Sequence, residues 1–149
     1  MNRTEAEAIF DNEDKCITED IVWSKDQQHY GNLVFEETLY CGNLQMRLKG
    51  SINPATDSLS FAIIHPKEGR IYGLDHGGHT HKNKSDKVRC GYLHKHRWRP
   101  EDHTWAYEPT DILGSSTEIQ KVWGEFCAEA KIYHAGKFYP PNDGLFDDE

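Results

Sequence analysis

The chain lacks the short motifs that mark several well-known protein classes. It has no C-x-x-C pair, no G-x-S-x-G turn, no H-E-x-x-H helix and no glycine-rich phosphate loop. These absences argue against a zinc ribbon, a thioredoxin-like protein, a kinase or P-loop enzyme, a zincin protease and a dinucleotide oxidoreductase. Cysteines are few and widely separated, so we expect four free thiols at Cys16, Cys41, Cys90 and Cys127.

Long apolar runs are also missing. No stretch approaches the roughly 18 apolar residues of a membrane span, and the opening "MNRTEAEAIF" has no signal-peptide pattern. We therefore expect a soluble, cytoplasmic protein with no membrane contact. The hydrophobic fraction is only 36%, but four Trp, seven Tyr and six Phe supply large side chains for a core. A chain of 149 residues predicts a single domain over 1–149.

Negative charge dominates the chain but is unevenly distributed. The net charge is −8, yet nine Lys/Arg and only three acids fall between Lys67 and Arg99, and the remainder carries a balance of −14. Such a basic segment can attract phosphate in an anionic protein. A solvated Lys/Arg-rich surface is the simpler alternative. The acidic remainder also fits a non-catalytic protein that binds a partner, as an antitoxin, a defence component or an inhibitor does.

Alternating apolar and polar residues predict a largely antiparallel β structure. The alternation is cleanest over 44–49, and further strands are expected over 33–41, 59–65, 70–75, 88–98 and, as an edge, 104–107. Apolar residues at helical spacing then predict one long helix that begins at a Ser115/Glu118 capping box and ends near Ile132. We expect an α+β fold, an antiparallel meander of about five or six strands packed by this C-terminal helix. Residues 1–20, with at most a short helix over "TEAEAIF", and 137–149 are expected to be loosely ordered.

Histidine is concentrated in "DHGGHTHKNKSDKVRCGYLHKHRW", 75–98, which holds five of the nine histidines. Because alternate residues of a strand share a face, His94 and His96 should point the same way, roughly 6–7 Å apart. His79 and His81 repeat this spacing, so two H-x-H pairs can face each other across a hairpin. Imidazoles suit Zn²⁺ or Ni²⁺. One interpretation is a single transition-metal ion held by His79, His81, His94 and His96, with Asp75, His76 and Cys90 as reserve ligands.

The same histidines also fit metal-independent cleavage of RNA, the leading interpretation. An imidazole with a pKa of about 6.5 can act as base or acid at neutral pH, and RNA supplies its own 2′-hydroxyl nucleophile. We expect His94 or His96 as the base, His81 as the acid, and Asn83 to orient an imidazole or to donate to an oxyanion. Expected substrate contacts are cations and stacking aromatics: Lys82, Lys95, Arg97, Tyr92 and Trp105. Strand alternation places Lys95 and Arg97 on the face opposite the histidines.

The order of these residues resembles a family of small prokaryotic proteins of unknown function. Its pattern is H-x-N, then G-x-x-H-x-H, then Trp-Ala, then a helix with an aromatic–Cys pair, matched here by His81, Asn83, Gly91, His94, His96, Trp105, Ala106, Phe126 and Cys127. This chain has "NKSDK" where the family carries Asn-Pro-Asp-Gly, and Leu93 where it carries Pro. The resemblance covers residues from about 70 to 135. It implies a shared site and names no reaction.

Overall fold

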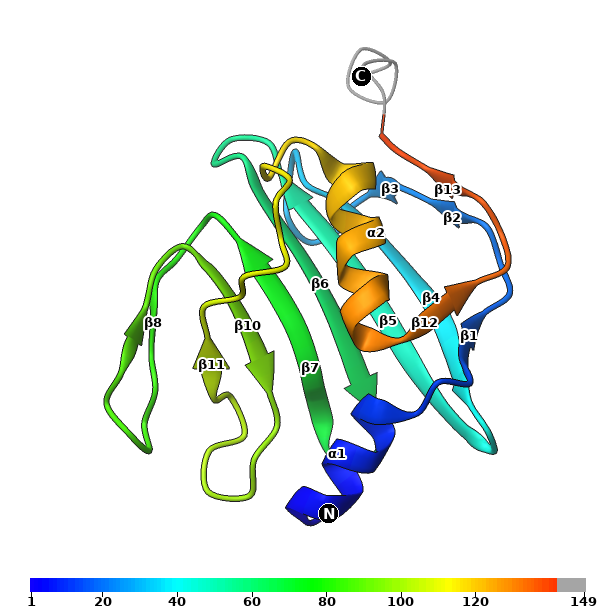
Figure 1. Cartoon of the computed structure of the whole chain (residues 1–149). Coiled ribbons are helices and arrows are strands. Elements are labelled where there is room, and N and C mark those ends of the chain that lie inside the picture. The colour runs from blue at the N-terminus through cyan, green and yellow to red at the C-terminus, as the bar shows by residue number, and fades with distance from the viewer. Residues whose placement is uncertain (142–149) are drawn as a thin grey trace.

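The structure, a computed structural model, describes residues 1–141. In that range the chain forms an α+β fold with two helices and thirteen strands (Figure 1). In chain order the elements are α1 (Arg3–Asp11), β1 (Lys15–Ile17), β2 (Ile21–Val22), β3 (Ser24–Lys25), β4 (Leu33–Cys41), β5 (Leu44–Asn53), β6 (Ser58–His65), β7 (Gly69–His76), β8 (His81–Lys82), β9 (Arg89–Cys90), β10 (Leu93–Arg97), β11 (Ala106–Tyr107), α2 (Ile119–Ala130), β12 (Ile132–His134) and β13 (Phe138–Tyr139).

A nine-stranded sheet dominates the fold. Its strand order is β11-β10-β7-β6-β5-β4-β1-β12, and β3 pairs with β4. The predicted antiparallel meander is confirmed as β4-β5-β6-β7, whose neighbours pair along most of their length. The sheet has more strands than the five or six expected, because short segments extend it at both edges. One of these added pairs, β1 with β12, is parallel.

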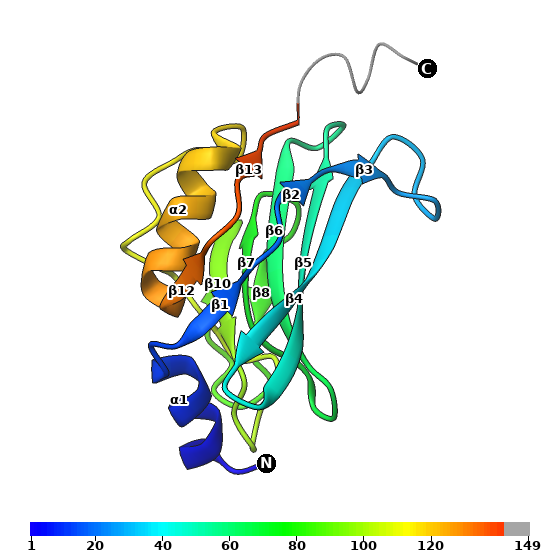
Figure 2. The same cartoon turned by 90° about the vertical axis from the view of Figure 1, so that its right-hand side faces the viewer.

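The predicted C-terminal helix is confirmed as α2, which covers one face of the sheet (Figure 2). Its Trp123 and Phe126 rings pack on Phe61 of β6, with ring centroids 5.2 and 5.3 Å apart. The helix begins at Ile119, after Glu118 as N-cap. The expected capping box is present only in part: the Ser115 amide donates to the Glu118 carboxylate over 3.0 Å, but Ser115 lies in the turn before the helix.

The N-terminal segment is more ordered than the sequence predicts, because 1–20 contain α1 and β1. The cause is Lys15, whose buried ammonium donates to the backbone carbonyls of Ile9, Phe10 and Asn12 over 2.6–2.7 Å. These carbonyls end α1, so one side chain ties the helix to β1. Of the expected C-terminal tail, β13 pairs with β2, and 142–149 lie outside the described residues.

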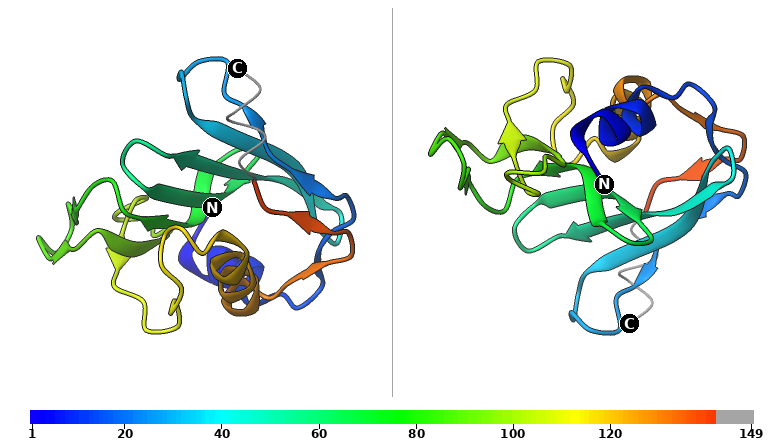
Figure 3. Two further views of the ribbon diagram at one scale, coloured as in Figure 1. Left: turned by 90° about the horizontal axis from the view of Figure 1, so that it is seen from above. Right: turned by 90° about the horizontal axis from the view of Figure 1, so that it is seen from below.

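Both helices lie on the same side of the sheet, as the end-on views show (Figure 3). The other side, here called the open face, carries small and polar side chains from the central strands. One row of paired residues crosses it from Ser51 through Ser60 and Asp75 to His94. The open face therefore positions the histidines of β10 beside the polar groups of β7 and β6.

All four cysteines are free thiols, as expected. Neither helix in the described part of the chain is long and apolar enough to span a membrane.

Candidate metal centre

The predicted strand over 88–98 is divided in two at Gly91 and Tyr92. Its first part is β9, which pairs with β8 in a separate hairpin, and its second part is β10, which joins the main sheet beside β7. His94 pairs with Asp75, and His96 pairs with Gly73. Alternation holds within β10, so both histidines lie on the open face, as the sequence predicts.

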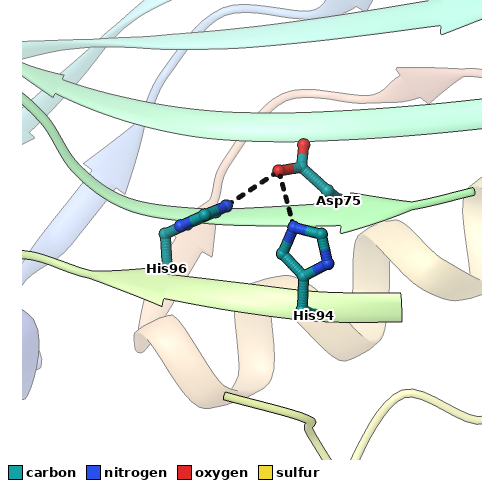
Figure 4. Close-up of side chains that lie close together, drawn as sticks. All are labelled: Asp75, His94 and His96. Atoms are coloured by element: carbon teal, nitrogen blue, oxygen red, sulfur yellow. Dashed lines mark hydrogen bonds and ion pairs between the residues drawn. The ribbon is translucent and has the colours of Figure 1, made fainter. Parts of the chain in front are cut away.

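Asp75, His94 and His96 form a compact group on this face (Figure 4). The Oδ2 atom of Asp75 lies 3.0 Å from Nε2 of His96 and 3.3 Å from Nε2 of His94. The two histidines are only 7% and 3% exposed, whereas the Asp75 side chain is 26% exposed. One oxygen and two imidazole nitrogens thus converge in a buried Asp/His/His group that can hold a metal ion.

The other nitrogen of each imidazole is bound to the backbone. Nδ1 of His94 donates to the carbonyl of Gly91, and Nδ1 of His96 donates to the carbonyl of Thr104, each over 2.8 Å. A carbonyl only accepts, so Nδ1 carries the hydrogen and Nε2 of the neutral ring carries the lone pair. Both Nε2 atoms face a carboxylate oxygen, so without a metal each must carry a second proton and donate to Asp75, whereas a cation between them would take the place of both protons. Metal-binding histidines are held by the same kind of Nδ1 bond.

Two further side chains hold the carboxylate of Asp75. The Ser60 hydroxyl donates to Oδ1 over 2.9 Å, and Nη2 of Arg70 donates to Oδ2 over 3.3 Å. Burial acts to raise the pKa of Asp75, but the hydrogen bonds from His94 and His96 and the charge of Arg70 outweigh it and hold the pKa well below its usual range. Asp75 therefore favours its ionised form, the form in which a carboxylate can bind a metal. Arg70 and Ser60 are site residues that sequence reasoning missed, because only strand pairing reveals them.

His81 brings a third imidazole to the group. Its ring centroid lies 4.8 Å from that of His96 and 5.8 Å from that of His94. Its Nε2 atom is buried and has no hydrogen-bond partner among the described residues. Burial first, and then the neighbouring charges of His96 and His94, lower the pKa of His81. The shift favours the neutral form of His81, and its buried Nε2 is a ring nitrogen that no described residue uses.

The β8–β9 hairpin that carries His81 is fixed by two buried polar residues. The Asn83 amide donates to the carbonyl of Ala106 over 2.9 Å and accepts from its N–H over 2.7 Å. Asp102 accepts from both the N–H and the hydroxyl of Ser85. The role expected for Asn83 is corrected accordingly: its amide orients the hairpin against β11, and both of its polar atoms are used by the backbone.

Of the four expected histidine ligands, His94 and His96 belong to the Asp/His/His group, and His79 and His81 do not. His79 is exposed at the rim of the site and does not belong to the Asp/His/His group. His76, a reserve ligand, bonds through Nε2 to the carbonyl of Gly114. Cys90, also a reserve, is buried in the hairpin opposite His81. The structure therefore groups His94 and His96 with Asp75, and the ring of His81 lies next to this group.

Two of the expected phosphate contacts lie on the wrong side of the sheet for that role. Lys95 is fully buried on the helix side, with its ammonium 2.7 Å from Asp111 and 3.0 Å from Glu129. The guanidinium of Arg97 stacks on the ring of Phe10 in α1, 3.8 Å from its centroid. The predicted alternation is confirmed, and it keeps both cations away from a substrate at the imidazoles.

The remaining expected substrate contacts lie outside the group. Lys82 and Tyr92 are exposed. Trp105 donates from Nε1 to Asp86, and the guanidinium of Arg99 covers its ring at 3.4 Å. This ring is therefore already stacked on its available face by a side chain of the protein.

An open groove leads to the Asp/His/His group. It has a volume of about 320 Å³, within the range of ligand sites. One side is formed by Ser, Thr and Asn side chains of the open face, and the other by Gly77, Gly78 and the hairpin residues that follow. The groove therefore connects the Asp/His/His group with solvent.

Comparisons with models of protein families, with curated proteins and with solved structures found no match to this chain. The resemblance to a prokaryotic family stays a prediction.

Proposed function

We propose that this protein binds one transition-metal ion, Zn²⁺ or Ni²⁺, through Asp75, His94 and His96, with His81 as a neighbouring imidazole. The observation that carries the proposal is the use of both Nδ1 atoms by backbone carbonyls. It leaves two Nε2 lone pairs and an ionised carboxylate directed at one point, which a cation satisfies.

The spacing of the donor atoms fits such an ion. Tetrahedral ligands that lie 2.0–2.1 Å from zinc are separated from one another by roughly 3.3–3.4 Å. The distances from Asp75 Oδ2 to the two imidazole nitrogens, 3.0 and 3.3 Å, are close to this separation, and the three donor atoms all lie within 4.8 Å of one another. The ring of His81 lies beside this three-ligand set, which leaves the fourth position of the ion to water or a ligand.

The surroundings fit a reactive centre better than a structural one. Structural zinc sites are closed by four protein ligands, usually with several cysteines. Here Asp75 and the three histidines line an open groove. A bound ion would act there as a Lewis acid and would lower the pKa of a bound water. The Ser60 hydroxyl holds the carboxylate of Asp75, and the backbone carbonyls of Gly91 and Thr104 hold the two imidazoles. The groove gives a ligand access to the ion.

Metal-independent RNA cleavage has less support, because the expected phosphate contacts Lys95 and Arg97 lie behind the sheet. An RNA substrate, an antitoxin or defence partner and a cytoplasmic location stay predictions.

Calorimetric titration of the untagged, chelator-treated protein with Zn²⁺ and with Ni²⁺ tests the proposal. We expect one equivalent to bind and to raise the melting temperature. His96→Ala should weaken binding by more than the roughly 10–100-fold that loss of an outer partner costs. His29→Ala, at a histidine 67% exposed and remote from the group, is the matched control. Equal affinity of the two variants, or no saturable binding by the parent, contradicts the proposal.

A further inference from the structure

A β-bulge in β7 directs Arg70 toward the metal centre. The pairing of β6 with β7 shifts register between Ile63 and Ile64: Ile63 pairs with Tyr72, whereas Ile64 pairs with Arg70. Ile71 is the extra residue, so the alternation of side chains is reset at this point. Arg70 consequently shares the open face with Gly73 and Asp75 instead of entering the core.

Gly73 makes room for the Arg70 side chain. A Cβ atom added at Gly73 would collide with Nη2, Nε and Cζ of Arg70. The guanidinium therefore lies over the bare backbone of β7 and reaches Oδ2 of Asp75. The bulge and the glycine together fix an arginine beside the ligand group, and bulges of this kind are frequent next to active sites.

The guanidinium retains donors for a ligand. Its Nε is buried and has no hydrogen-bond partner among the described residues, while the side chain as a whole is 34% exposed. Among residues 1–141 its ion pair is made with Asp75, through the same Oδ2 atom that faces His94 and His96. Nη2 of Arg70 thus lies beside the oxygen at which the two imidazoles meet.

We propose that Arg70 and the metal ion together bind the phosphoryl group of a phosphate ester, an inference that rests on the metal centre proposed above. One phosphoryl oxygen ligates the ion, and others accept from the guanidinium. Arginine suits this role because its planar fork matches phosphate oxygens, and a charge-assisted bond to it is stronger than a neutral one.

Charge and oxygen count favour a phosphoryl group over a carboxylate. With a divalent ion bound, neutral histidines, ionised Asp75 and Arg70 leave the centre with a formal charge of +2, which a phosphate dianion neutralises. One metal position and the two N–H groups of an arginine fork offer three places for oxygen atoms. A phosphate monoester has three terminal oxygens, whereas a carboxylate has two.

The experiment uses Co²⁺ as a spectroscopic replacement for the native ion. The parent protein, Arg70→Gln, Arg70→Lys and Arg47→Gln are first titrated with Co²⁺, and the loaded proteins are then titrated with inorganic phosphate and with acetate. Arg47 is the matched control, because it is an arginine of β5 whose guanidinium pairs with Glu36 and Thr38 and not with the metal group.

We expect phosphate to change the Co²⁺ absorption of the parent and of Arg47→Gln at similar concentrations, and acetate to bind more weakly. Arg70→Gln should take up Co²⁺ but bind phosphate roughly 10- to 100-fold more weakly, with Arg70→Lys in between. Phosphate affinity that does not depend on Arg70, acetate affinity equal to that of phosphate, or loss of Co²⁺ uptake in both Arg70 variants overturns this inference alone. A parent protein that takes up no Co²⁺ overturns the metal centre and this inference with it.

Discussion

Asp75 and His96 meet on the open face of the sheet, with Oδ2 of one 3.0 Å from Nε2 of the other, although 21 residues separate them in the chain. The contact exists because β7 and β10 are antiparallel neighbours in the sheet. The β8–β9 hairpin lies between them in the chain, and it carries His81. Two imidazoles therefore face one oxygen of the Asp75 carboxylate, and the ring of His81 lies beside them. The metal proposal follows from this arrangement.

Asp75→Asn should weaken Zn²⁺ binding far more than Ser60→Ala does. The asparagine keeps the shape of the side chain but removes its negative charge. The imidazole ligands are neutral, so they cannot replace that charge. Ser60 acts only by holding the other carboxylate oxygen, so its loss should cost about 10–100-fold. Competition with a fluorescent chelator measures both affinities. Equal effects of the two changes would show that Asp75 is not itself a ligand.

Metal affinity should fall as the pH is lowered. A histidine binds metal only in its neutral form. Burial acts to lower the pKa of His94, but its hydrogen bonds to Asp75 and to the Gly91 carbonyl outweigh burial and raise that pKa above the ordinary imidazole value, so protons compete with the ion already above about pH 6.5. The sign is fixed, because each proton taken up by a ligand must leave before the ion binds. Zn²⁺ titrations at several pH values between 5.5 and 8 test this. Affinity that is constant across the range contradicts binding by histidine.

Asn83→Ala should destabilise the protein by about 1–3 kcal/mol, because it leaves the buried N–H and carbonyl of Ala106 without their partner. The hairpin then holds His81 less firmly, while His94 and His96 stay in place on β10. Denaturant unfolding of this variant beside Lys84→Ala, at an exposed position of the same hairpin, gives the comparison. Unchanged stability of Asn83→Ala would return Asn83 to a direct role at the site.

Lys95→Met should lower the free energy of unfolding by a few kcal/mol. Lys95 is fully buried, and its removal leaves Asp111 and Glu129 without their cation. Loss of one partner of a buried pair costs about 3–5 kcal/mol, and partial exposure of both acids places the effect at the low end. Lys82→Met, at an exposed position, should have little effect. Equal stability of the two variants would contradict a structural role for Lys95.

Sequence periodicity predicts local features of this protein, such as where a strand runs and which side chains share one of its faces. Alternation with a period of two places His94 and His96 on one face and Lys95 on the other, and it identifies the meander strands. The role of Lys95 as a phosphate contact conflicts with that same alternation, and the structure decides in favour of alternation.

Features that depend on which strands pair, and in which register, could not be predicted from the sequence. Asp75 is recognisable as a reserve ligand, but its position opposite His94 follows from the β7–β10 register, which periodicity leaves open. The bulge that turns Arg70 to the open face resets the alternation without a local signal. The buried amide of Asn83 belongs to a contact between distant segments, and the strand pattern is interrupted at Gly91, whose carbonyl accepts from Nδ1 of His94.

The most direct measurement is an anomalous-difference map, recorded at the zinc absorption edge, from crystals of untagged protein grown with one equivalent of Zn²⁺. The account predicts one strong peak in contact with Oδ2 of Asp75 and Nε2 of His94 and His96, with His81 turned toward it. A map with no peak there, or with peaks only at exposed histidines such as His29 or His79, would contradict the metal centre.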